Sequence, residues 1–468
     1  MPLACTHTAP PRPATATPTK AAWEYEVRAS GPDARELAVE GRFAVGASDV
    51  LRIDDAATPF VRDVEYDSGQ RWTPAIVRGP TWTAPCHRIG CRVRYRFALR
   101  EAATKIDDAE TAIASGDVVV APPSTWLLHP DGPAGRLRFH VSSVLPGRFA
   151  AGTHAASGSP DGVRDTFEVT TDALAEASFA VFGPFHEAVV RRGAARIDIA
   201  IAPRGLALTD ADVVSWVSSA VDAIASYYGR FPVDHTLVVV QAHQGSDSTR
   251  GETLGEGGPA VLVSPSEHAT AASLRDDWVM THELLHVTLP SLPHQERWLS
   301  EGIPTYVEPI ARARVGLVAP EKLWRDLVEG IPQGLPRAGD EGLERTHTWG
   351  RTYWGGALYC LLADVMIREQ TGNRRALDDA IRAVSSTGAD VEAHWEVARF
   401  IEIGDRATGT HVLGDLYRDM ALAPGTVDLA ALWNRLGVHV VDGSRVVLDN
   451  AAPLALVRQA ITAAPAQP

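Results

Sequence analysis

One helix-length segment of this 468-residue chain constrains the fold strongly, because it is apolar on every side and yet contains two histidines and a glutamate. A helix that is apolar all round is buried, and His282, Glu283 and His286 are costly to bury unless something binds or pairs them. We expect the helix to begin at a capping box of Ser273 and Asp276 and to be ended by the prolines at 290 and 293. The apolar residues that predict its burial are Leu274, Trp278, Val279, Met280, Leu284, Leu285, Val287 and Leu289.

The two histidines have the spacing that a shared metal ion requires. His282 and His286 are four residues apart, so on a helix they lie on one face, one turn apart. Two imidazoles in this arrangement reach one metal ion, and Glu283 reaches a water molecule on it. Glu301 offers a carboxylate as third ligand, and three protein ligands plus water are the open coordination of a catalytic zinc. We expect one Zn²⁺ per chain; the alternative, two surface histidines on an ordinary helix, conflicts with the apolar surroundings.

A second helix is expected to carry Glu301. Ser300 is the expected cap, Pro304 is tolerated in the first turn, and Pro309 is expected to kink or end the helix. Glu308 follows Glu301 by seven residues and lies on the same face. We expect Glu308 to accept a hydrogen bond from the outer nitrogen of a ligand histidine; a surface carboxylate is the alternative.

A glycine-rich stretch over residues 251–264 leads into the histidine helix. Glycines such as Gly257 and Gly258 let a backbone approach a ligand closely, and an edge strand here is suited to pairing with an extended peptide. We expect Glu256, Gly257 and Gly258 to bind substrate; a flexible loop is the alternative.

The hydrophobic period changes near residue 206. Residues 23 to about 203 contain short alternating or apolar runs separated by Gly, Pro and Asp, the pattern of a β-sandwich. Helical spacing begins at residue 209, and the chain is mostly helical from residue 349 onward. We expect an α+β protein with a Pro/Thr/Ala-rich tail (1–22), an N-terminal β-sandwich-like domain (23–203), an α/β catalytic domain (204–330) and a C-terminal helical region (331–468).

The charge and hydropathy of the chain exclude some partners. The 44 basic and 58 acidic residues give a formal charge of −14 without a basic block, so nucleic acid and anionic membrane surfaces are poor partners. No apolar run reaches the length of about 18 residues that a membrane-spanning helix needs. Cys86 and Cys91 frame a short turn, where a disulfide and two free thiols stay equal alternatives. Cys360 lies in an apolar helical run and is expected in the core.

The N-terminus points to export. Leu3-Ala4-Cys5, followed by an extended tether, resembles the mature start of a bacterial lipoprotein and favours an exported or periplasmic protein with a lipid anchor at Cys5. The charged and apolar regions of a signal peptide do not precede it, so a cytoplasmic protein is the alternative.

The H-E-x-x-H pattern at residues 282–286 and the Trp-Leu-Ser-Glu-Gly segment at 298–302 together resemble the gluzincin metallopeptidases. The likeness is closest to the aminopeptidase N and glycyl aminopeptidase families, and it covers roughly residues 205–400. It implies a thermolysin-like catalytic domain.

The same resemblance implies roles for individual residues. It makes His282, His286 and Glu301 zinc ligands and Glu283 the general base. Tyr353, in a Tyr-x-x-Gly turn, matches the residue that stabilises the oxyanion in these families. The helix after Tyr353 and the Gly-Asn that ends it are most similar to the glycyl aminopeptidase family.

Several departures from these families concern substrate recognition. The link over residues 287–300 is shorter than is usual in the aminopeptidase N family. The Gly-x-Met-Glu-Asn element, whose glutamate holds the substrate's free amine, is replaced by Gly-Glu-Gly-Gly-Pro at 255–259, where Glu256 or Glu252 is the candidate substitute. Gly355 stands where a lysine is usual, and no PDZ-like module follows residue 400.

We expect a zinc metallopeptidase that resembles aminopeptidases and whose partner is a peptide or protein substrate. A metal-activated water attacks the peptide bond with Glu283 as base. The missing amine-binding motif and Gly355 leave open a zinc-containing binding or scaffold protein of the same fold. Hydrolysis of a non-peptide amide or ester is a further alternative, since the same chemistry would serve it.

Overall fold

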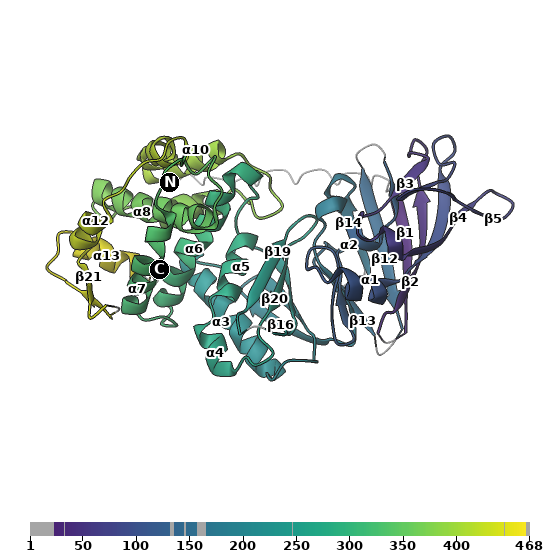
Figure 1. Cartoon of the computed structure of the whole chain (residues 1–468), viewed down its shortest axis with the longest axis horizontal. Coiled ribbons are helices and arrows are strands. Elements are labelled where there is room, and N and C mark those ends of the chain that lie inside the picture. The colour runs from purple at the N-terminus through teal and green to yellow at the C-terminus, as the bar shows by residue number, and fades with distance from the viewer. Residues whose placement is uncertain are drawn as a thin grey trace, which may run out of the picture.

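A computed structural model describes residues 23–31, 33–131, 135–144, 147–156, 165–245, 247–443 and 445–464. The expected tail at 1–22 and the expected anchor at Cys5 lie outside the described residues. The molecule is elongated, with β-sheets at one end, a five-stranded sheet in the middle and helices at the other end (Figure 1). The α+β fold, with a sheet-rich N-terminal part and a helical C-terminal region, is therefore confirmed.

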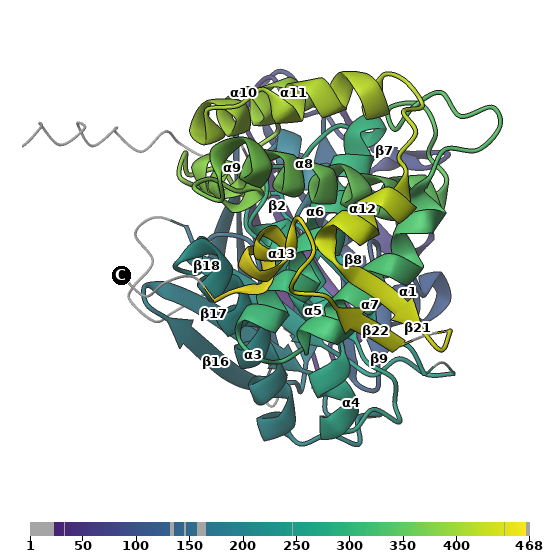
Figure 2. The same ribbon diagram turned by 90° about the vertical axis from the view of Figure 1, so that its left-hand side faces the viewer.

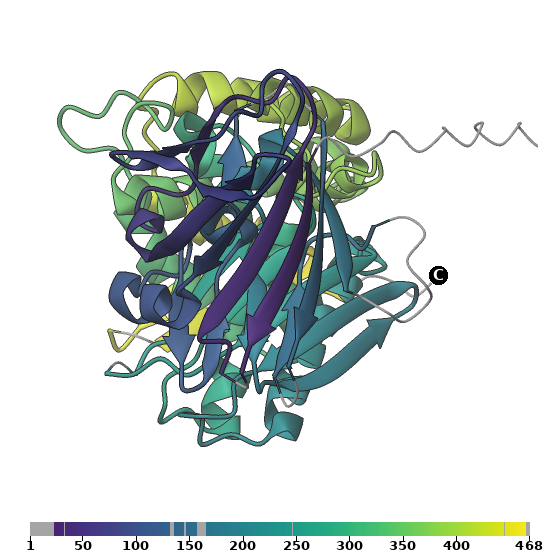
Figure 3. The ribbon, with the colours of Figure 1, turned by 90° about the vertical axis from the view of Figure 1, so that its right-hand side faces the viewer.

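The N-terminal part is built on a seven-stranded sheet in the order β14-β12-β1-β2-β8-β4-β5, with two four-stranded sheets, β13-β15-β10-β9 and β11-β3-β7-β6. Alternate residues of β1 are buried, as a strand with one face on the core requires. Figure 3 looks onto this end, where the purple strands β1 and β2 run side by side. The elements are β1 Trp23–Ser30, β2 Glu36–Phe43, β3 Val50–Arg52, β4 Val61–Asp67, β5 Trp72–Pro74, β6 Ile76–Arg78, β7 Thr81–Thr83, β8 Cys91–Phe97, α1 Leu99–Ile106, β9 Ile113–Ser115, β10 Val118–Val120, α2 Pro123–Trp126, β11 His129–Pro130, β12 Arg136–Ser143, β13 Arg148–Ala151, β14 Thr166–Thr170 and β15 Ala180–Gly183.

Two of the three described cysteines form a disulfide, and the third is a buried free thiol. Cys86 and Cys91 form a disulfide across the turn that precedes β8, which decides between the two alternatives left by the sequence. Cys360 is buried in the core as a free thiol, as expected.

The middle sheet has the order β16-β17-β18-β20-β19, and β19 is one of its edges. Its inner strands β17, β18 and β20 are parallel, while β16 and β19 pair antiparallel. The strands are β16 His186–Arg192, β17 Ala195–Ile201, β18 His235–Val240, β19 Arg250–Leu254 and β20 Ala260–Ser264. The sheet thus takes β16 and β17 from the segment expected to be N-terminal; the domain limits themselves stay predictions.

The helix with the two histidines is shorter than expected. It is broken into α4 (Ala271–Asp276) and α5 (Val279–Val287), because Asp277 is extended and its carboxylate accepts a hydrogen bond from the Val279 N–H at 3.0 Å. The predicted cap at Ser273 is wrong: Thr270 caps α4, and Ser273 is its partner in the capping box. Trp278 was expected to be buried but is 51% exposed, since it lies at the break.

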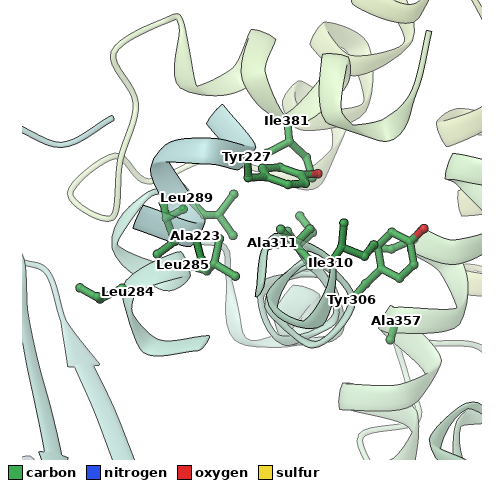
Figure 4. Close-up of a cluster of buried hydrophobic side chains, with 14 of the residues drawn as sticks. Ala223, Tyr227, Leu284, Leu285, Leu289, Tyr306, Ile310, Ala311, Ala357 and Ile381 are labelled. Carbon is green, nitrogen blue, oxygen red and sulfur yellow. The ribbon is translucent and has the colours of Figure 1, made fainter. Parts of the chain in front are cut away.

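The next helix is longer than expected. α6 runs from Arg297 to Arg314, so Ser300 lies inside it rather than at its cap, and Pro304 and Pro309 both lie in its interior. Most helical stability comes from tertiary packing, and α6 is buried along most of its length. Figure 4 shows Tyr306, Ile310 and Ala311 of α6 between the leucines of α5 and Ala357 of α8 (Gly356–Thr371). This packing outweighs the local cost of the prolines.

Most of the remaining helices form the end of the molecule that faces the viewer in Figure 2. The only sheet described among them is the hairpin β21-β22. The elements are α3 Asp210–Tyr228, α7 Pro320–Gly330, α9 Leu377–Ser385, α10 Val397–Thr408, α11 Val412–Leu416, α12 Leu429–Leu436, β21 Val438–Val441, β22 Arg445–Leu448 and α13 Ala455–Thr462. Within the described ranges, each helix is too short or too polar to cross a bilayer.

Candidate metal centre

Three side chains converge between α5 and α6. Nε2 of His282 and Nε2 of His286 each lie 3.3 Å from Oε2 of Glu301, and one ligand atom from each residue falls within 4.8 Å of the others. Two imidazole nitrogens and one carboxylate oxygen are a donor set that zinc takes in catalytic sites. Since the three atoms lie this close together, the residues fit a single zinc ion.

The crossing of α6 with α8 brings Glu301 to the histidines. Gly302 follows Glu301, and a Cβ at this position would lie 2.4 Å from Cα of Gly356, the first residue of α8. The two backbones therefore touch, and only glycine is tolerated at this contact. Leu284, on the face of α5 opposite the histidines, and Leu285 are both fully buried.

Glu283 is held by the edge strand β19. The Thr253 hydroxyl donates to Oε2 of Glu283 at 2.8 Å and to the Glu283 carbonyl at 3.1 Å. Gly251 lies directly against the same side chain, because a Cβ there would be 2.4 Å from Cγ of Glu283. The glutamate next to the first histidine is therefore fixed in position by a neighbouring strand.

Tyr353 and Arg297 lie beside the third carboxylate. Tyr353 belongs to a π-helical turn over Arg351–Gly355, and its ring stacks with that of His282 at a centroid distance of 6.4 Å. Nε and Nη2 of Arg297 each donate to Oε1 of Glu301 at 3.3 Å. Burial and the Glu301 carboxylate raise the pKa of Tyr353 to about 12, although Arg297 acts in the opposite direction. The phenol thus keeps its proton at neutral pH and remains a donor.

The electrostatics of the cluster favour a bound cation. Burial alone raises the pKa of Glu301, but His286 and His282 outweigh it and hold that pKa well below its ordinary value. Burial lowers the pKa of His286, yet the carboxylates of Glu301, Glu283 and Glu252 raise it to about 9. Burial and the nearby Glu283 raise the pKa of Glu252 to about 7. Five acidic and imidazole groups thus share a partly buried space that a divalent cation would neutralise.

The three residues expected to bind substrate make contacts with residues outside the cluster. The carbonyls of Glu256 and Gly257 accept hydrogen bonds from the N–H groups of Ser178 and His154, at 3.0 and 2.8 Å. The Glu256 carboxylate contacts His394. This stretch therefore joins the middle sheet to the N-terminal part, and the structure brings β19 to the cluster in its place.

Glu308 has a different partner from the one expected. Its Oε1 accepts a hydrogen bond from Nη1 of Arg312 at 2.7 Å, and burial raises its pKa to about 7 although Arg312 acts against this. Nδ1 of His282 is buried without a hydrogen-bond partner in the described structure. The predicted bond between Glu308 and a ligand histidine is not made, although both side chains line one cavity.

Sequence reasoning missed Gly251, Thr253 and Arg297. The signal for the first two was a β-hairpin: the runs 250–254 and 260–264 are separated by a turn with paired glycines, which is a hairpin pattern, and the structure pairs them antiparallel. Arg297 had no signal, because it is adjacent to the family-like segment rather than in it. Glu252, which was weighed beside Glu256 as a substitute for the family's amine-binding glutamate, lies on the same strand as Thr253.

Comparisons with known proteins support the fold. No family model matches the sequence, and no curated protein matches it. Among solved structures, an aminopeptidase N family protein from Idiomarina loihiensis superposes with a TM-score of 0.68 at 13% identity, over 89% of this chain and 78% of that chain. A glutamate-to-alanine mutant of the M1 zinc metallopeptidase from Deinococcus radiodurans, bound to a Tyr-Ser-Ala substrate, gives 0.51 at 15% identity, over 86% and 94%. The gluzincin aminopeptidase-like fold that the sequence resemblance implied is therefore confirmed.

Proposed function

We propose that this protein is a zinc-dependent metallopeptidase that cleaves peptides with a free N-terminus. His282, His286 and Glu301 hold the metal. The observation that carries the proposal is the convergence of both Nε2 atoms on one oxygen of Glu301, at 3.3 Å each, beside a glutamate oriented by Thr253. The fold shared with M1 zinc metallopeptidases supports it.

Glu283, Tyr353 and Arg297 have different roles in the proposed reaction. When bound, zinc polarises the scissile carbonyl and lowers the pKa of a water molecule from about 15.7 to about 7. Glu283 accepts a proton from the attacking water and delivers it to the leaving nitrogen. Tyr353 donates its phenolic proton in a hydrogen bond to the developing oxyanion. Arg297, next to both Tyr353 and Glu301, holds the free oxygen of the third ligand.

The strand β19 is suited to hold the peptide. As an edge strand it has unpaired backbone groups that an extended peptide is able to match. Glu252, on this strand and close to Glu283, is the carboxylate best placed for the substrate's amine. Glu256, whose carboxylate contacts His394, is less suited to the task.

The experiment is metal analysis combined with digestion of a diverse peptide library, read by mass spectrometry. Wild type should contain about one zinc per chain, and Glu301→Ala should lose it. Glu283→Gln should keep zinc and lose cleavage. Glu329→Ala, which removes an exposed glutamate on α7, is the matched control and should behave as wild type.

Each outcome separates the alternatives. Zinc-dependent removal of N-terminal residues supports the proposal. Cuts inside the peptides would instead show an endopeptidase and would refute the cleavage of N-terminal residues. Zinc without any cleavage would favour the binding or scaffold protein. Absence of zinc after reconstitution would refute the metal site, and an active Glu283→Gln would refute the assignment of the base.

A further inference from the structure

A cavity of about 380 Å³ opens beside the metal-binding cluster. Its wall includes the rings of His282 and Tyr353, so it begins at the proposed reaction centre. Its floor is one face of α6, where Thr305, Glu308, Pro309 and Arg312 recur at helical spacing. The volume lies near the lower end of the range of about 300–1,000 Å³ for ligand pockets. A space of this size and position fits one side chain of a bound substrate.

The cavity is lined by tryptophans that the fold leaves exposed. Trp278 and Trp349 are 51% and 61% exposed, although large aromatic side chains are otherwise mostly buried in this protein. A third, Trp354, lies flat against Gly330, where a Cβ would come within 2.1 Å of its ring. Two exposed tryptophans in one hollow are costly to maintain without an apolar partner.

The rings form a continuous aromatic surface that leads to the ligands. Trp278 meets His282 edge-on at a centroid distance of 5.2 Å. Tyr353 stacks between His282, at 6.4 Å, and Trp349, at 5.6 Å. The surface thus runs from Trp278 through both functional rings to Trp349, and aromatic side chains pack on such surfaces by offset or edge contacts.

The charges around the cavity favour an uncharged occupant. Arg312 pairs with Glu308 at 2.7 Å, and Lys322 pairs with Asp326 at 2.5 Å, so these four groups cancel within the wall. The remaining acidic residue, Asp276, is exposed to solvent. A charged side chain would therefore lose its hydration, and the one acidic group outside these pairs, Asp276, is at the solvent.

We propose that this tryptophan-lined cavity is a specificity pocket for an aromatic or large aliphatic side chain next to the scissile bond. The inference rests on the proposed function. The cavity lies on the His282 and Tyr353 side of the cluster, whereas Glu252 interacts with Glu283 and His286. The pocket and the amine-binding strand therefore contact different parts of one peptide.

The first test compares cleavage preferences of wild type, Trp278→Ala and Trp349→Ala in the peptide library. Both tryptophans are more than half exposed, so these variants remove little core, which thermal unfolding checks. Trp72→Ala is the matched control, because Trp72 is a partly exposed tryptophan on β5 of the N-terminal sheet. Wild type and control should prefer Phe, Tyr, Trp or Leu over Ala at one position flanking the cut. The preference should fall about ten- to a hundredfold in each cavity variant.

The second test is independent of hydrolysis. Calorimetric titration of zinc-loaded Glu283→Gln with phenylalaninamide and glycinamide should show tighter binding of the aromatic amide, and adding Trp349→Ala should remove the difference. If wild type cleaves nothing but this difference exists, the proposed function fails while the pocket stands. A preference for small or charged residues on both sides of the cut, equal binding of the two amides, or an unchanged preference in both tryptophan variants would each overturn the pocket.

Discussion

Replacing Gly251 by alanine should impair the proposed general base without touching a metal ligand. In the structure the new Cβ would lie 2.4 Å from Cγ and 2.7 Å from Oε1 of Glu283. Ordinary carbon contacts begin near 3.4 Å, so strand and side chain must separate by about 1.0 Å. Glu283 cannot simply rotate away, because Thr253 holds both its carboxylate and its carbonyl.

The magnitude follows from this displacement. A misplacement of about 1 Å in a catalytic group costs roughly 10²-fold in rate. We therefore expect kcat/KM of Gly251→Ala to fall about a hundredfold on the best peptide found. Zinc content should remain at the wild-type level, because His282, His286 and Glu301 are untouched. The overpacking itself should destabilise the protein by about 1–3 kcal/mol.

The control is a second glycine close to the same strand. A Cβ at Gly255 would lie 2.5 Å from Val391, a clash of similar severity that does not involve Glu283. Steady-state kinetics, metal analysis and urea unfolding should show that Gly255→Ala loses comparable stability but little activity. If zinc-loaded Gly251→Ala is as active as wild type while Glu283→Gln is inactive, the argument from contact is wrong. Equal loss of activity in both glycine variants would refute it too, since a general shift of β19 would then be the cause.

Three further predictions concern the proton, the oxyanion and the core. Burial lowers the pKa of His286, but Glu301, Glu283 and Glu252 raise it to about 9, so the metal-free imidazole is protonated at pH 7. Calorimetry in two buffers should therefore detect release of about one proton per zinc bound, and the zinc affinity should rise with pH up to about 9. Zinc binding without proton release would contradict this. Tyr353→Phe should keep its zinc and lose about 10²–10³ in kcat, whereas wild-type turnover would remove Tyr353 from the mechanism. Asp378→Ala should lower the free energy of unfolding, measured in urea, by about 3–5 kcal/mol, because it leaves the Arg314 side chain, paired at 2.6 Å and 2% exposed, without its carboxylate. The control is Glu402→Ala, which removes the partner of Arg406 in an exposed ion pair and should cost less than about 1 kcal/mol.

Local sequence was most informative about side chains that lie on the same helix. The spacing of His282 and His286 places both imidazoles on one face whatever the surrounding fold, and the apolar residues around them correctly indicated burial of most of α5. The segment containing Glu301 was recognised by its likeness to known families, and the structure brings that carboxylate to the histidines. The same kind of local pattern indicated an edge strand in the glycine-rich stretch, with a flexible loop as the alternative, but the hairpin of β19 and β20 was not predicted.

Local rules failed where packing between elements outweighs them. Ser300 has the pattern of an N-terminal cap and Pro309 that of a helix end, yet α6 begins before Ser300 and continues past Pro309, because its buried face is held by α5 and α8. Ser273 has the pattern of a cap but serves as the partner of Thr270, and the extended Asp277 starts a new helix. Trp278 belongs to an apolar run, but the break places it at the rim of a cavity.

The sequence by itself determined which residue types stand one helical turn apart, and this was enough to predict a zinc ligand pair and its adjacent base. Only the tertiary structure decided that Gly251 and Thr253 position Glu283, that Glu308 pairs with Arg312, and that three tryptophans from two separate segments line one cavity. Spacing along a helix follows from its repeat of 3.6 residues. Contacts between distant segments depend instead on how whole elements pack, and no local pattern contains that information.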